Sequence, residues 1–195
     1  NTVSAVALDI VQKRAKVPVV GVIFPGAEAA ARATSKKRVG IIGTMGTVAS
    51  NAYPNALRQI GPAIQTFSRA CPLFVPLAEE GWMDHKATEL IAKEYLFPLT
   101  LEKIDTLILG CTHYPLLKDI ISKVLHQTVT LIDSGEATAG TVARLLDELK
   151  LKNSSKLKPN LQFFVSDVPF KFTEIGEQFL GQKLGKVHRV SGFAA

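Results

Sequence analysis

The chain has 195 residues, of which 47% are hydrophobic, and its 23 Lys and Arg against 17 Asp and Glu give a formal net charge of +6. This length suits one large or two small domains with a buried core. No run approaches the ~18 uninterrupted apolar residues of a membrane span, and no charged-then-apolar leader is recognisable, so we expect a cytoplasmic protein with no membrane partner.

The hydrophobic pattern predicts alternating helices and strands along the first half of the chain. Apolar positions 3, 6, 7, 10 and 11 follow helical spacing, and Asn1 or Thr2 can cap that helix. The other elements expected in this half are strands over 17–23, 37–44 and 64–70, a helix over 47–60 that bends near Pro54, and a loop over 71–82.

The second half continues the alternation. We expect helices over 84–97, 115–126, 136–150 and 173–180, strands over 105–111, 128–134, 161–167 and 185–190, and a polar linker over 152–160. Strands that alternate with helices are typical of an α/β fold with a largely parallel sheet, or of two such sheets. The first helix opens the chain with no strand before it, so we expect the chain to be the C-terminal part of a longer protein.

Small and hydroxyl- or thiol-bearing residues follow three of the predicted strands. They stand in "IIGTMGT" (41–47), "LILGCTH" (107–113) and "LIDSG" (131–135). Open α/β folds bind ligands beyond the carboxyl ends of their strands, where helix N-termini attract anions. This pattern predicts a site for a small carboxylate or phosphate. "GTMGT" lacks the ending of a P-loop and no GxGxxG follows a strand, so a nucleotide is not supported.

The two cysteines have different surroundings. Cys111 follows a buried run and precedes a helix, where a helix N-terminus and His113 can both lower a thiol pKa. Cys111 is therefore either an acid/base or nucleophilic group or an inert core residue, and His113 either assists it or simply begins a helix. We interpret Cys71, with no acid/base neighbour, as structural. The absence of a CxxC pair favours free thiols in a reducing compartment.

Other charged and metal-binding groups point to no further chemistry. His85, His126 and His188 fit surface positions, and one Cys-x-His does not make a zinc site. Residues 150–195 hold eight Lys or Arg against three Asp or Glu, which leaves open a polyanion partner. The lysines are scattered without interleaved aromatics, so we favour a solvated surface and no nucleic acid.

At "LGCTHYPLL" (109–117) the chain resembles the second-cysteine motif of the glutamate racemases, in the aspartate/glutamate racemase superfamily. Three further stretches agree with this resemblance and keep the family's motif order. "IGTMGTVASNAY" (42–53) is similar to its Gly-Thr…Thr-x-x-Ser…Tyr segment, "CPLFVPLAEEG" (71–81) to its Cys-Pro…Pro-Leu-x-Glu…Gly segment, and "NTVSAVAL" (1–8) to the stretch after its first catalytic cysteine.

The resemblance implies an isomerase that needs no cofactor and no metal. One cysteine removes the α-proton of glutamate and another returns a proton to the opposite face, which supplies D-glutamate for peptidoglycan. By resemblance the catalytic residues are Cys111 and His113. The substrate-binding residues implied are Asn1, Thr2, Thr44, Thr47, Glu79, Thr112 and His113. Aspartate-specific relatives tend to carry Glu after Cys-Thr, so His113 argues for glutamate.

The family's first catalytic cysteine would stand directly before Asn1. The resemblance therefore implies that this chain alone does not racemise glutamate. It also implies two pseudo-symmetric parallel-sheet α/β domains around the substrate, with 1–23 and 134–195 in an incomplete first domain and 24–133 forming the second. A homodimer is compatible with the family.

Three other interpretations remain open. The chain could be a relative that acts on aspartate, a hydantoin or a malonate-like acid. It could be a non-catalytic protein that binds a small carboxylate at the strand ends, in which case Cys111→Ala would leave function intact. A cysteine hydrolase would instead form a covalent acyl-enzyme at Cys111.

Overall fold

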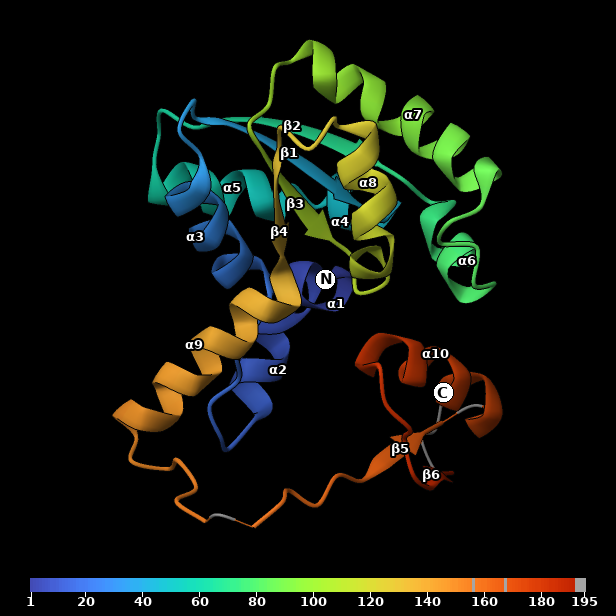
Figure 1. The fold of residues 1–195 in the computed structure, drawn as a ribbon. Helices are drawn as coiled ribbons and strands as arrows, with labels where there is room; N and C mark the ends of the chain where they lie inside the picture. The colour runs from blue at the N-terminus through green and yellow to red at the C-terminus, as the bar shows by residue number, and fades with distance from the viewer. Residues whose placement is uncertain (156, 167, 192–195) are drawn as a thin grey trace. The chain divides into compact units, whose positions relative to one another are not determined.

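A computed structural model describes residues 1–155, 157–166 and 168–191. The chain divides into two compact units, Asn1–Lys152 and Asn153–Ala195. Helices and strands alternate through both units (Figure 1), which confirms the predicted α/β class. No helix among these described residues is long and apolar enough to cross a membrane.

The first unit contains four strands and most of the helices. The strands are β1 (Arg38–Gly43), β2 (Gln65–Ala70), β3 (Thr106–Gly110) and β4 (Thr130–Asp133). The helices are α1 (Thr2–Val6), α2 (Leu8–Arg14), α3 (Ile23–Ala33), α4 (Met45–Ala49), α5 (Ala52–Ile60), α6 (Phe74–Glu79), α7 (Lys86–Leu101), the 3-10 helix η1 (Tyr114–Leu117), α8 (Lys118–Val124) and α9 (Ser134–Glu148).

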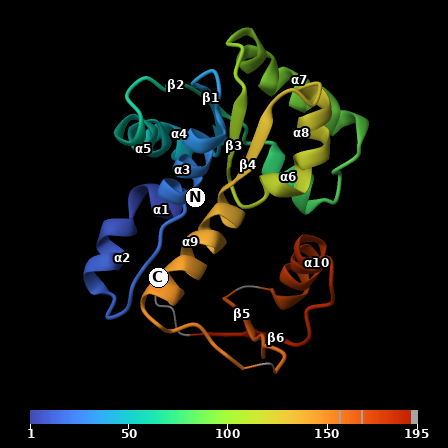
Figure 2. The same cartoon turned by 60° about the vertical axis from the view of Figure 1, so that its left-hand side comes forward.

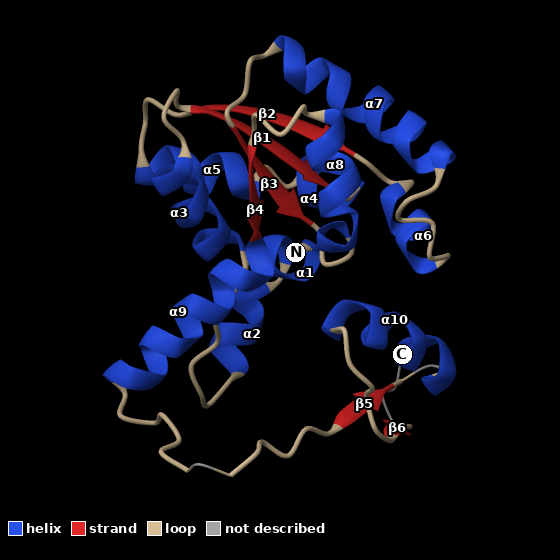
Figure 3. Ribbon diagram, viewed as in Figure 1, coloured by secondary structure: helices blue, strands red, loops and turns tan. Residues whose placement is uncertain are grey.

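The four strands form one parallel sheet in the order β2-β1-β3-β4. The two central strands, β1 and β3, are buried on both faces because helices cover the sheet on both sides (Figure 3). The edge strand β2 is polar and contains no buried residue. Val39, Ile41 and Ile108 point to a core shared with α3 and α5. Leu107 and Leu109, one position away along β3, point to the opposite core beneath α6, α7 and α8.

The predicted strand over 17–23 is wrong. The segment has no regular structure up to Val22, and α3 begins at Ile23. Among the residues that the structure describes, no strand pairs with this apolar run. Instead Gln12 Nε2 donates to the Val19 carbonyl, and the Val22 N–H donates to Ser4 Oγ at 3.4 Å. The side chains of Gln12 and Ser4 thus form hydrogen bonds with backbone groups of this segment that would pair with a neighbouring strand in a sheet.

Two other predictions need correction. The expected loop over 71–82 contains α6, whose Phe74 is buried and packs edge-on against Tyr95 and Tyr114. The helix expected over 47–60 is two helices, with the break at Asn51, whose φ is 53°. The break precedes Pro54, which then lies in the first turn of α5, where its missing N–H costs no helical hydrogen bond.

The second unit is small. Phe163–Val165 (β5) and Val187–Arg189 (β6) form a two-stranded parallel sheet, and Pro169–Leu180 (α10) connects them. These elements agree with the predicted strands and helix, although the prediction at residue 167 lies outside the described residues. The linker has no regular structure over 152–155 and 157–160, as predicted; residue 156 lies outside the described residues.

Candidate functional site at the strand ends

The carboxyl ends of β1, β3 and β4 lie side by side at one edge of the sheet. Gly43 is in register with Gly110, and Leu109 with Asp133. The chain therefore brings together Thr44, Cys111 and Ser134, the residues that directly follow Gly43, Gly110 and Asp133. Figure 2 shows the start of the chain close to the beginning of α9, and a hydrogen bond between Asn1 and Ser134 confirms this contact.

Cys111 lies on a tightly packed turn at the end of β3. A Cβ at Gly110 would stand 2.6 Å from the Ile42 carbonyl oxygen, so only glycine fits between β1 and β3 here. The next turn is fixed by Tyr114, whose buried hydroxyl donates to the Cys71 carbonyl at 2.8 Å. Cys111 is held in place on both sides and is itself 6% exposed.

His113 lies between the thiol and a carboxylate. Its Nδ1 is 4.0 Å from Cys111 Sγ and 3.4 Å from Thr112 Oγ1. Its Nε2 is 3.2 Å from Glu79 Oε1, at the end of α6. The structure thus aligns the predicted residues Cys111, His113 and Glu79 in one row. This is the order of groups that passes a proton between a thiol and an imidazole and stabilises the imidazolium that forms.

The pKa of Cys111 differs from the sequence expectation. Burial raises the pKa of the thiol above its usual value. The backbone N–H of His113 and the Thr112 hydroxyl act in the opposite direction, but less strongly. The thiol is therefore mostly protonated at neutral pH, and the thiolate that forms is a stronger base than that of an exposed cysteine.

A triangle of threonine hydroxyls lies at the end of β1. Thr2 Oγ1 is 2.9 Å from Thr44 Oγ1 and 3.2 Å from Thr47 Oγ1, and these last two oxygens are 3.1 Å apart. Thr44 caps α4 by accepting the Thr47 N–H. Three hydroxyls at a helix start, at the end of the strand that pairs with β3, are suited to hydrogen-bond a carboxylate.

Asn1 does not cap the first helix with its side chain, contrary to expectation. Its Oδ1 instead accepts from the Tyr53 hydroxyl at 2.5 Å, and its Nδ2 donates to Ser134 Oγ at 3.3 Å. Tyr53 and Ser134 are buried. Sequence reasoning did not select either residue as a site residue, although Tyr53 stands in the quoted 42–53 motif and Ser134 in "LIDSG".

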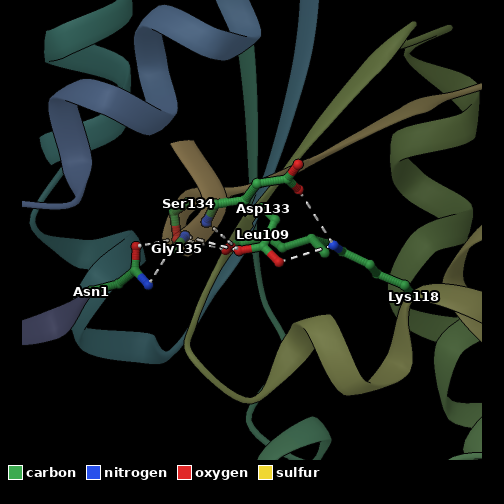
Figure 4. Close-up of polar contacts among 7 residues, drawn as sticks. Asn1, Leu109, Lys118, Asp133, Ser134 and Gly135 are labelled. Carbon is green, nitrogen blue, oxygen red and sulfur yellow. Dashed lines mark hydrogen bonds and ion pairs between the residues drawn. The ribbon is translucent and has the colours of Figure 1, made fainter. Parts of the chain in front are cut away.

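An ion pair completes the edge of the sheet. Lys118 Nζ lies 2.9 Å from Asp133 Oδ2, and Asp133 Oδ1 accepts the N–H groups of Gly135 and Glu136 at the start of α9 (Figure 4). Burial raises the pKa of Asp133, but Lys118 and the two N–H groups lower it more, so the carboxylate remains ionised. Lys118 and Asp133 were not among the site residues expected from the sequence.

Comparisons with known proteins point to one family. The sequence profile of the Asp/Glu/Hydantoin racemase family matches residues 1–142. The glutamate racemase of Geobacter metallireducens is 50% identical over 191 residues, which are 98% of this chain and 71% of that protein. The glutamate racemase of Syntrophus aciditrophicus is 48% identical, over 97% of this chain and 70% of that one.

The chain belongs to the glutamate racemases of this family. Solved structures agree on the fold. The glutamate racemase isoform RacE1 from Bacillus anthracis superposes with a TM-score of 0.92 and 39% identity, over 97% of this chain and 71% of that one. The Francisella tularensis glutamate racemase, solved with D-glutamate, gives a TM-score of 0.89 and 41% identity, over 97% and 70%.

Proposed function

We propose that Cys111 is one of the two acid/base groups of a cofactor-independent racemisation of glutamate, with His113 and Glu79 as its proton partners. The observation that carries this proposal is the row Cys111 Sγ, His113 and Glu79, with distances of 4.0 Å and 3.2 Å, at the carboxyl end of β3. A structural cysteine would not need an imidazole and a carboxylate aligned behind it.

The proton transfers can be written from these contacts. His113 Nδ1 accepts the proton of Cys111 Sγ, and the Glu79 carboxylate stabilises the imidazolium. The thiolate then takes the α-proton of glutamate and becomes a neutral thiol, and the substrate becomes a carbanion. A second acid delivers a proton to the opposite face. In the reverse direction Cys111 donates, which suits a thiol whose raised pKa keeps it protonated.

The polar groups around Cys111 can anchor the substrate. Thr2, Thr44 and Thr47 bring their hydroxyls together at the end of β1, the strand in register with β3 that leads to Cys111, and Asn1 presents an amide. Thr112 is exposed next to Cys111 and adds a hydroxyl and a main-chain N–H. We assign these five residues to substrate binding, with Glu79 and His113 at the edge of the same site.

Cys71 does not qualify as the second acid/base group. It is fully buried, and burial raises its pKa to about 12 despite the charge of Arg69. The resemblance puts the family's first catalytic cysteine directly before Asn1, so we expect the 195-residue chain alone to be inactive. We further propose that the intact enzyme works in the cytoplasm, supplies D-glutamate for peptidoglycan and forms a homodimer.

The test is protection of Cys111 from alkylation. Iodoacetamide modifies thiols, and peptide mapping by mass spectrometry separates Cys111 from Cys71, which serves as the internal control. We expect D- and L-glutamate to slow the alkylation of Cys111, and aspartate to have a much weaker effect. If glutamate gives no protection at millimolar concentration, Cys111 does not line a glutamate site and the proposal fails.

A further inference from the structure

The strand end "LIDSG" has no role in the proton transfers described above, yet it contacts both sides of the site. Ser134 is 3% exposed. Its Oγ lies 3.2 Å from the Leu109 carbonyl oxygen and 3.3 Å from both Oδ1 and Nδ2 of Asn1. Leu109 stands two residues before Cys111, so one buried hydroxyl joins the Asn1 side chain to the strand that carries the thiol.

The available protons decide how these bonds are arranged. Asn1 Oδ1 already accepts from the Tyr53 hydroxyl, which burial keeps protonated by raising its pKa. The Ser134 hydroxyl has one proton, and the buried Leu109 carbonyl accepts it. A lone pair of Ser134 Oγ then accepts from Asn1 Nδ2. Tyr53 and Ser134 therefore fix which end of the Asn1 amide lies where, and one N–H of Nδ2 is left to donate elsewhere.

Asp133 contacts the segment that follows Cys111 and His113. Its Oδ1 caps α9, while its Oδ2 binds Lys118, the first residue of α8 and the residue after η1 (Figure 4). Asp133 is only 15% exposed at its side chain, and Lys118 39%. A helix cap requires one carboxylate oxygen. The second oxygen fixes the segment that follows Cys111 and His113, just as Ser134 fixes the strand that precedes them.

We propose that Asp133 and Ser134 are positioning residues, which together hold Asn1 and the Cys111–His113 loop in the geometry that binds glutamate. This inference rests on the proposed function, because it assigns Asn1 and Cys111 to one glutamate site. It adds two residues that contact no reacting atom and act through Asn1, Leu109 and Lys118.

The experiment uses the alkylation assay and measures the D-glutamate concentration that halves the rate of Cys111 modification. Ser134→Ala removes the link between Asn1 and Leu109. A lost buried hydrogen bond of this kind corresponds to a roughly five- to tenfold increase in that concentration. Thr141→Ala is the matched control, since Thr141 also lies in α9 and its hydroxyl bonds only within that helix, donating to the Ala137 carbonyl and accepting from Arg144. In Thr141→Ala, we expect the D-glutamate concentration that halves Cys111 modification to stay within about twofold of the wild-type value.

The ion pair is tested from its exposed end, so that folding is preserved. We expect Lys118→Met to raise the half-protection concentration several-fold and Lys118→Arg to restore it, with circular dichroism unchanged in both variants. Asp133→Asn keeps a capping oxygen and should resemble Lys118→Met, whereas Asp147→Asn, which breaks the exposed pair with Lys152, should have no effect.

The two proposals fail in different ways. If glutamate protects wild-type Cys111 but Ser134→Ala and Lys118→Met are protected equally well, Asp133 and Ser134 are ordinary cap and core residues. If glutamate does not protect the wild type at all, the assignment of the glutamate site is wrong.

Discussion

Gly110 offers a direct test of how the packing of β1 against β3 places Cys111. In Gly110→Ala the new Cβ would lie 2.6 Å from the Ile42 carbonyl oxygen and 3.1 Å from Tyr53 Cε2. The first distance is about 0.9 Å shorter than the ~3.5 Å of a favourable contact. The opposing atom belongs to the backbone of β1, which cannot rotate away as a side chain does.

The magnitude follows from two opposing effects. Overpacking of this kind costs about 1–3 kcal/mol, while replacing glycine with alanine gains about 0.4–1 kcal/mol from the unfolded chain. Taking the middle of each range, about 2 and about 0.7 kcal/mol, we expect Gly110→Ala to lose about 1.3 kcal/mol of unfolding free energy. Gly140→Ala is the control: it lies inside α9, and no atom stands within 4 Å of the added Cβ. This change should gain about 0.5–1 kcal/mol.

Urea unfolding followed by the fluorescence of Trp82, the only tryptophan, measures both free energies. The same protein samples should show altered alkylation of Cys111 in Gly110→Ala and normal alkylation in Gly140→Ala. If Gly110→Ala is as stable as the wild type and its Cys111 reacts normally, the contact between β1 and β3 does not fix the position of the thiol.

Three further predictions concern single groups. The alkylation rate of Cys111 should still be rising with pH at ~8.5, where an ordinary thiol is half ionised, because burial raises its pKa; a plateau below that pH would contradict this. Cys71, with a pKa of about 12 and no exposure, should react only when urea unfolds the chain, and reaction in native buffer would argue against its burial. Burial raises the pKa of Asp105, but hydrogen bonds from Thr34 and the residues after it lower it more. Asp105→Asn should therefore lose about 1–2 kcal/mol at pH 7, and urea unfolding should show this difference disappear as the pH falls below ~4, through the folded-state pKa.

The central strands β1 and β3 could be predicted from the sequence because each is a short apolar run buried on both faces, as central parallel strands are. The edge strands β2 and β4 carry a weaker signal, since β2 has no buried residue and β4 has one. The run over 17–23 has a similar apolar composition but is not a strand, since none of the strands described above pairs with it and side chains bond to its backbone. The pattern alone does not distinguish these cases. Helix α6 was missed because Pro72 and Pro76 suggest a loop, whereas the packing of Phe74 between two tyrosines is tertiary.

The candidate site, too, could be predicted from the sequence only in part. The identity of Cys111, His113 and the threonines follows from motifs at strand ends, which are local in sequence. The contacts that organise them are not local: Asn1 to Ser134 spans 133 positions and Asn1 to Tyr53 spans 52. The direction of the Cys111 pKa could not be predicted either, since it depends on burial rather than on His113. The division into domains 1–23 with 134–195, and 24–133, remains a prediction.

The most direct test of the central claim is exchange of the α-proton of D- and L-glutamate in D₂O, followed by NMR. It compares the 195-residue chain with a chain extended upstream through the family's first catalytic cysteine, each with and without Cys111→Ala. We predict that the extended chain exchanges and interconverts both enantiomers, and that the other three proteins do not interconvert them. If the extended chain binds glutamate but never exchanges its α-proton, or if Cys111→Ala leaves exchange intact, Cys111 is not an acid/base group of a glutamate racemase.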